Sequence, residues 1–142
     1  MKLSLFMASV GLLASLSSAS AQGDLDALRW KNRILILFAP SDGDPSFTRQ
    51  SRLLLADEKG LAERELVVLG VAGGKVETLF GDPRAKHDAG ALRRHFGLDA
   101  RAPFEAILIG KDGGVKWRQD APFEPRDMNA VIDAMPMRRA GR

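Results

Sequence analysis

The chain has 142 residues, no cysteine and a formal net charge of +3 at pH 7. Because the chain has no thiol, its own residues cannot form disulfides or thiolate metal sites. They also cannot carry out thiol-based oxidoreductase or peroxidase chemistry. Charges of both signs are interspersed, and basic side chains cluster only at Arg138, Arg139 and Arg142. This weak positive field argues against nucleic-acid binding, which favours a basic face with interleaved aromatic residues.

The first 21 residues have the pattern of a secretory signal peptide. Lys2 supplies the positive charge, an apolar run follows from Leu3 to Leu16, and Ala19-Ser20-Ala21 is a small-residue cleavage site. The apolar run is too short to span a membrane comfortably, and no later run approaches about 18 residues. We therefore expect cleavage after Ala21, a periplasmic or secreted location without stable membrane insertion, and one domain over residues 22–142.

The first elements of this domain form a strand–helix–strand unit. Residues 33–38 and 65–71 are apolar runs without alternation, which is typical of strands covered on both faces. Between them, Asp44 and Pro45 suit the N-cap and the first position of a helix, and Gly60 suits the left-handed residue after its end. This order predicts that the two strands are parallel neighbours.

The second half of the domain is predicted to add a helix, a hairpin and a last helix. Residues 75–87 are polar and are predicted to be an excursion from the sheet. Asp88 caps the next helix, and strands at 104–109 and 115–118 flank a tight Asp-Gly turn. Pro125 opens a final helix whose apolar residues recur at i, i+3, i+4 and i+7, as on a core-facing stripe.

Two segments resemble parts of thioredoxins and peroxiredoxins. Residues 36–45 resemble the strand, Ala-Pro and helix start of a thioredoxin active site, with Asp42 and Pro45 where that family has cysteines. Residues 96–114 resemble the segment that leads through Pro103 to the hairpin. Together with the order of elements, this implies an α/β, thioredoxin-like fold with a central mixed four-stranded β-sheet flanked by helices.

The chain also resembles DUF4174, a family of domains of unknown function. The resemblance is carried by residues 25–33, 39–40, 50, 63–65, 108–116 and the distinctive end at 132–138. It implies an exported thioredoxin-like or peroxiredoxin-like domain with relatives inside larger extracellular proteins of animals. It implies no known reaction.

The loop after the first strand is the candidate site, by analogy with proteins of this fold. Capping of the helix is the simplest role for its aspartates. The functional alternative is a surface for an unknown protein or small ligand, formed by Ser41, Asp42, Asp44, Thr48, Arg49 and Gln50. We favour a non-redox binding or interaction module of the cell envelope, with no catalytic residue.

The sequence is also compatible with two other functions. One is a cysteine-independent enzyme in which Asp42 or Asp44 acts as the base, assisted by Arg49 or His87. Another is an oxidative-stress-linked or structural factor of the envelope.

No cofactor or metal is expected. The run 42–44 lacks the glycine and glutamate that a calcium loop needs at its later positions. His87 and His95 are the only histidines, and without cysteine they complete a zinc site only if carboxylates fill in. We expect His87 to be a solvated loop residue, and Arg64 and Glu65 to pair with each other before the second strand.

Overall fold

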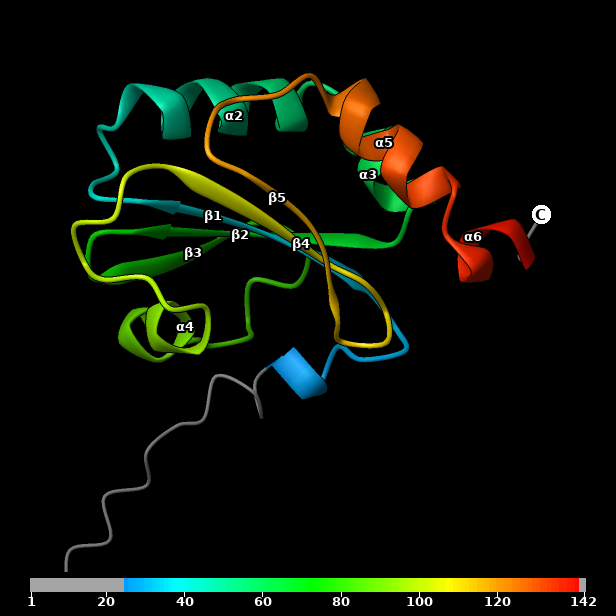
Figure 1. The fold of residues 1–142 in the computed structure, drawn as a ribbon, viewed down its shortest axis with the longest axis horizontal. Helices are drawn as coiled ribbons and strands as arrows, with labels where there is room; N and C mark the ends of the chain where they lie inside the picture. Colours follow the sequence, from blue (N-terminus) through cyan, green and yellow to red (C-terminus); the bar gives the residue numbers. More distant parts are fainter. Residues whose placement is uncertain (1–24, 141–142) are drawn as a thin grey trace, which may run out of the picture.

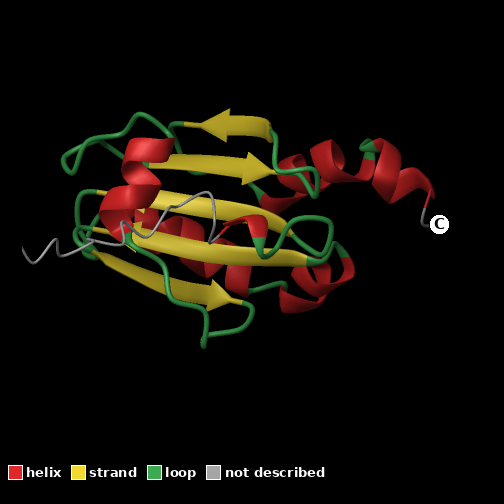
Figure 2. Ribbon diagram, turned by 90° about the horizontal axis from the view of Figure 1, so that it is seen from below, coloured by secondary structure: helices red, strands yellow, loops and turns green. Residues whose placement is uncertain are grey.

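The computed structural model describes residues 25–140 and shows one sheet with helices on both faces (Figures 1 and 2). The predicted signal peptide, residues 1–21, lies outside this described part. The strands are β1 (Arg33–Ala39), β2 (Leu66–Ala72), β3 (Lys75–Phe80), β4 (Glu105–Ile109) and β5 (Val115–Gln119). The helices are α2 (Pro45–Leu55), α3 (Glu58–Glu63), α4 (Ala89–His95), α5 (Pro125–Asp133) and α6 (Pro136–Ala140). The predicted α/β class with a mixed sheet is confirmed.

β1 lies at the centre of the sheet, in which the strand order is β3-β2-β1-β4-β5. It pairs in parallel with β2 and antiparallel with β4, which confirms the predicted strand–helix–strand unit. All of its residues are buried, as expected of a strand covered on two faces. The register places Ala39 of β1 beside Ala72 of β2, so the carboxyl ends of the two strands lie at the same edge of the sheet.

Alternate residues of β1 pack into two separate hydrophobic layers. Ile34, Ile36 and Phe38 belong to the layer beneath α4, and the residues between them belong to the layer beneath α2, α3 and α5. In this second layer Met128 and Ile132 of α5 are fully buried, which confirms the core-facing stripe of the last helix. Figure 1 shows α4 on one side of the sheet and α2 and α5 on the other.

The sheet has five strands rather than the predicted four. β3 occupies the first part of residues 75–87, where the sequence predicted a polar excursion. Gly73, with φ 58, lies in the tight turn that folds β3 back onto β2. Val76 and Thr78 are half-buried and the residue between them is exposed, so β3 has the alternation of an edge strand.

The predicted long helix after Asp44 is in fact two helices. α2 ends at Leu55, and Asp57 starts α3 by accepting a hydrogen bond from the Gly60 N–H at 3.1 Å. Gly60 therefore lies inside α3, where a Cβ would collide with the Asp57 carboxylate. The left-handed residue after the helix is Glu65, with φ 52. Over residues 25–140, no helix combines the length and apolar character needed to cross a membrane.

Candidate functional site

The candidate loop, residues 40–44, connects β1 to α2 at the carboxyl edge of the parallel pair. Asp44 caps α2, because its Oδ2 accepts a hydrogen bond from the Phe47 N–H at 3.0 Å. Pro45 follows as the first residue of the helix. The predicted capping role of Asp44 is confirmed, and its carboxylate is thereby engaged with the backbone.

The structure places five of the six candidate residues at the surface. The exposed or half-buried ones are Ser41, Asp42, Asp44, Thr48 and Arg49. Gln50 is fully buried: its Nε2 donates to the Phe123 carbonyl at 3.1 Å, and its Oε1 accepts from the Phe123 N–H at 2.7 Å. Gln50 therefore links α2 to the segment before α5 and does not reach the surface expected from the sequence.

A cavity of about 280 Å³ lies between the candidate loop and the β2–β3 hairpin. It is lined by Asp42, Phe47, Gly70, Ala72, Lys75, Val76 and Glu77. Gly70 leaves room for the ring of Phe47, since a Cβ at position 70 would lie 2.7 Å from that ring. The cavity therefore joins an apolar floor to side chains of both charges.

Arg93 of α4 fixes the backbone around this cavity. The residue is only 4% exposed, and its Nη2 donates to the carbonyls of Ala39 at 2.9 Å and Gly73 at 3.0 Å. Burial lowers the pKa of Arg93, yet an arginine remains charged in proteins. One buried cation thus joins the ends of β1 and β2. Sequence reasoning missed it, although its position four residues after Ala89 places it on the apolar face of α4.

The histidine that the enzymatic hypothesis offered as one of two assisting groups lies elsewhere. His87 lines a separate cavity of about 400 Å³, together with Leu28, Val67 and Phe80. Both of its ring nitrogens are buried and have no hydrogen-bond partner in the described part of the chain. The prediction of a solvated loop histidine is therefore wrong. His87 and Asp42 line different cavities, so the structure does not assemble them into one site.

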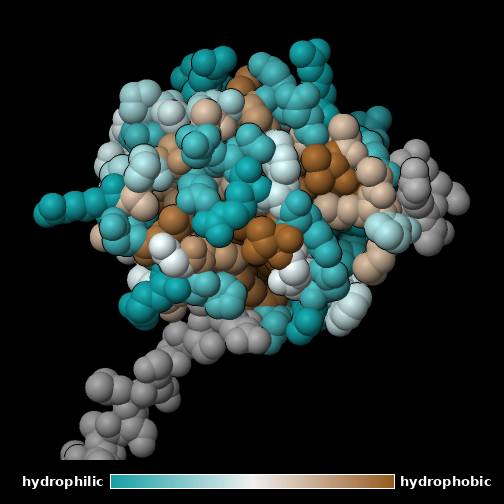
Figure 3. Space-filling model, viewed as in Figure 1, coloured by the Kyte–Doolittle hydropathy of each residue, from teal (hydrophilic) through white to brown (hydrophobic). Residues whose placement is uncertain are grey.

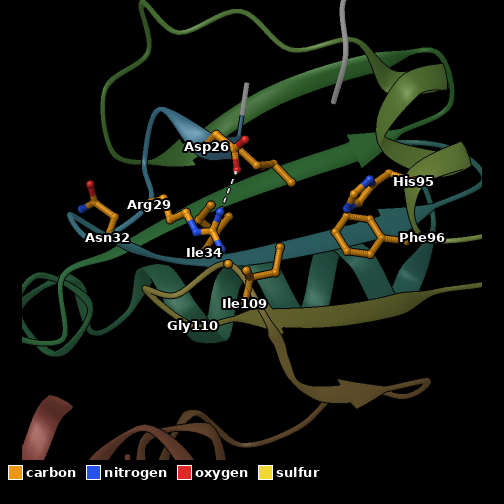
Figure 4. A pocket seen from close by; sticks show the side chains of 10 residues that line it. Asp26, Arg29, Asn32, Ile34, His95, Phe96, Ile109 and Gly110 are labelled. Atoms are coloured by element: carbon orange, nitrogen blue, oxygen red, sulfur yellow. Dashed lines mark ion pairs between the residues drawn. The ribbon is translucent and has the colours of Figure 1, made fainter. Parts of the chain in front are cut away.

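A further cavity, of about 130 Å³, lies between β1, β4, the N-terminal turn and the end of α4 (Figure 4). Arg29 and Asp26 form an ion pair of 3.8 Å on one side, and the rings of His95 and Phe96 lie on the other. His95 is an exposed helix residue, as predicted. Among residues 25–140, no group of three or more acidic or histidine side chains is arranged to hold a metal ion.

Ion pairs gather at the opposite, amino ends of β1 and β2. Arg64 and Glu65 do not pair with each other, contrary to the prediction from the sequence. Arg64 pairs with Asp133 of α5 at 3.0 Å, and Glu65 pairs with Lys111 at 2.8 Å. These two ion pairs connect the start of β2 to α5 and to the β4–β5 turn.

Asp133 should make the stability of the protein sensitive to acid. Hydrogen bonds from Arg64 hold the pKa of Asp133 below its ordinary value of 3.8. A lowered folded-state pKa contributes stability above the unfolded-state pKa, and this contribution is lost as the pH falls through the folded-state value. Asp133→Asn should therefore lose less stability than the wild type between about pH 4 and pH 2 in urea titrations. Asn129→Ala, a neutral change on the same helix, should keep the wild-type pH dependence; equal slopes for Asp133→Asn and wild type would contradict this role.

Comparisons with known proteins agree with the architecture. The family described as "Domain of unknown function (DUF4174)" matches residues 24–141. Coiled-coil domain-containing protein 80 from Danio rerio is 26% identical over 136 residues, an alignment that covers 84% of this chain and 16% of that relative. The structure of reduced Plasmodium vivax 2-Cys peroxiredoxin has a TM-score of 0.59 and 17% identity, covering 82% of this chain and 84% of that one. The thioredoxin-like fold is thereby confirmed, and at this identity the likeness concerns the fold alone.

Proposed function

This chain belongs to the DUF4174 family and has a thioredoxin-like fold without cysteine, and on that basis we propose that it is an exported, non-redox binding module. Its recognition surface is the candidate loop, residues 40–44, with the first turn of α2. The ligand is a protein segment or a small molecule that enters the cavity beside Asp42.

The proposal is supported by two neighbouring loops whose backbone is anchored, next to polar side chains that have no hydrogen-bond or ion-pair partner among the described residues. Arg93 bonds to the carbonyls of Ala39 and Gly73, so the ends of two neighbouring loops are held together. By contrast, the side chains of Asp42, Thr48 and Arg49 make no hydrogen bond or ion pair with other described residues. A frame that is already ordered lowers the entropic cost of binding, and free polar groups supply specific contacts.

The chemistry of the cavity indicates what kind of ligand would fit. Phe47 and Val76 provide apolar surface, whereas Asp42, Lys75 and Glu77 provide charges of both signs. An apolar group flanked by polar or charged groups matches this arrangement. An enzymatic role has less support, because Asp44 is engaged in capping and His87 lines another cavity.

Site-specific photo-crosslinking in the native host tests this function. A benzophenone amino acid at Thr48 should give discrete adducts in the envelope fraction, and the same probe at the exposed Ala130 of α5 should not. Adding Asp42→Asn and Arg49→Gln should reduce the yield of these adducts at least about fivefold, because the polar contacts are lost.

The matched control is a double substitution of two exposed residues outside the site, Asp120→Asn and Arg126→Gln. This variant should keep the adduct yield of the parent protein. Equal adducts from Thr48 and Ala130, or a yield indifferent to the change at Asp42 and Arg49, would rule out the candidate loop as the recognition surface.

A further inference from the structure

A second cavity with binding chemistry opens at the amino end of β1, at the opposite end of that strand from the candidate loop. Its volume is about 360 Å³. We call it the Trp30 groove, and its lining includes Trp30, Arg33, Lys111, Asp112, Lys116, Met135 and Met137. The space-filling view shows hydrophobic surface where α5 meets α6, next to this end of the sheet (Figure 3).

The apolar walls of the Trp30 groove are unusually exposed. In the described part of the chain, three large hydrophobic side chains are exposed, and two of them line this groove: Trp30 at 61% and Met137 at 46%. Trp30 also has a left-handed backbone, with φ 66, which is strained for a bulky residue. Its backbone N–H donates to the Lys111 carbonyl at 2.7 Å, so the β4–β5 turn holds the backbone of Trp30 in this conformation.

Arg33, in contrast, is a buried cation with few partners. The residue is 2% exposed, and among the described residues the only hydrogen bond of its side chain runs from Nη1 to the Arg64 carbonyl at 3.0 Å. Its Nε is buried without a partner. Burial lowers the pKa of Arg33, but arginine stays protonated in proteins, so its positive charge is poorly compensated. The Nε of Arg93 is likewise buried without a partner, but the other two guanidinium nitrogens of Arg93 donate to four backbone carbonyls.

The carboxylates near Arg33 are engaged with other cations. Glu65 acts on Arg33 electrostatically, but its hydrogen-bond partner is Lys111 at 2.8 Å. Lys116 likewise pairs with Asp112 at 2.8 Å. Asp133, also close enough to act on Arg33, accepts hydrogen bonds from Arg64 and Arg138. Within the described part of this network, Arg33 is therefore the cation without a hydrogen-bonded carboxylate.

We propose that the Trp30 groove binds a small molecule with one carboxylate and an apolar body. The carboxylate pairs with the guanidinium of Arg33, and the apolar body lies between Trp30 and the methionines. Guanidinium groups bind carboxylates through paired N–H···O bonds, and methionine side chains adapt to apolar ligands of different shape. The volume of the groove lies in the range of small-molecule sites. This site is separate from the candidate loop, so neither proposal depends on the other.

Titration of the protein with decanoate, below its micelle concentration, tests the groove. Calorimetry should detect binding, and nitrogen–proton NMR spectra should show shifts at the Trp30 indole N–H and at Gly110, which also lines the groove. Decanol, which lacks the charge, and acetate, which lacks the apolar body, should each bind at least about tenfold more weakly. Tighter binding of a leucine-terminated octapeptide than of decanoate would overturn the assignment to a small molecule.

Three variants separate the contributions to binding. Trp30→Gly removes the apolar wall and places glycine where φ is positive, so the fold is retained while decanoate affinity falls about tenfold or more. Arg33→Met keeps apolar volume without charge, so the preference for decanoate over decanol should disappear. Val115→Ser changes the third exposed hydrophobic side chain, which does not line the groove, and should leave affinity unchanged.

The proposal is overturned if decanoate does not bind, if its NMR shifts lie outside the groove, or if Trp30→Gly keeps the wild-type affinity. An equal loss of affinity in Val115→Ser would also overturn it. Should Arg33→Met fail to fold, the Trp30→Gly comparison alone still decides whether the groove is the binding site.

Discussion

Replacing Gln50 with leucine should lower the free energy of unfolding by roughly 2–4 kcal/mol. The Gln50 side chain is fully buried, and its amide satisfies both the N–H and the carbonyl of Phe123. Leucine has similar volume but no polar atoms, so both backbone groups would lose their partner in a buried setting. Urea unfolding followed by circular dichroism measures this loss.

The neighbouring Arg49 provides the matched control for this substitution. Arg49 is exposed, so Arg49→Leu should change the free energy of unfolding by no more than about 0.5 kcal/mol. A Gln50→Leu protein as stable as the wild type would show that the link between α2 and Phe123 contributes nothing.

Replacing Arg93 with methionine should cost about 2–4 kcal/mol of stability and loosen one end of the sheet. The guanidinium donates to carbonyls at the end of β1, in the β2–β3 hairpin and at Asp99. Without it, these carbonyls lose a charged donor and the two loops lose their common anchor. Hydrogen exchange should accelerate more at residues 40–44 and 73–75 than in α5, where it should accelerate only as far as global stability falls.

Two further substitutions test the cause of this effect. Arg94→Met alters the exposed neighbour on α4 and should be close to neutral. Arg93→Lys keeps the charge but not the planar fork of donors, so its loss of stability should lie between wild type and Arg93→Met. If Arg93→Met leaves exchange at the two loops unchanged, the anchoring role that supports the proposed binding surface is incorrect.

The central part of the fold was predictable because local signals and tertiary position agree there. The uninterrupted apolar runs at β1 and β2 reflect burial on both faces, and they gave the parallel pair correctly. The caps at Asp44 and Asp88 are likewise local, since each side chain bonds to a backbone N–H three residues later. Such interactions are encoded within a few residues and need no knowledge of the fold.

The edges of the fold gave weaker signals. β3 lies at the border of the sheet, so its sequence mixes polar and apolar residues, although the Gly73-Gly74 turn before it is a hairpin signal. The division of the helix after Asp44 was marked by Asp57, whose side chain caps α3. The prediction instead relied on Gly60, because glycine more often ends a helix than lies within one.

The candidate site was predictable in position but not in its supporting contacts. Gln50 meets a residue 73 positions away, and Arg93 meets Ala39 54 positions away. Nothing local specifies such partners. The same limit explains the wrong pairing of Arg64 and Glu65. Arg64 is the C-cap of α3 and Glu65 has a left-handed backbone, so the chain turns between them and their side chains reach different elements.

The two outermost strands have a consequence for how molecules of this protein meet one another. β3 exposes Lys75 and Glu77, and β5 exposes Lys116 and Arg118. Charged side chains on a border strand discourage the addition of a foreign strand, which is the first step of edge-to-edge polymerisation. The charged side chains on β3 and β5 therefore oppose the assembly of this domain into fibres, although it has no disulfide to restrain its unfolding.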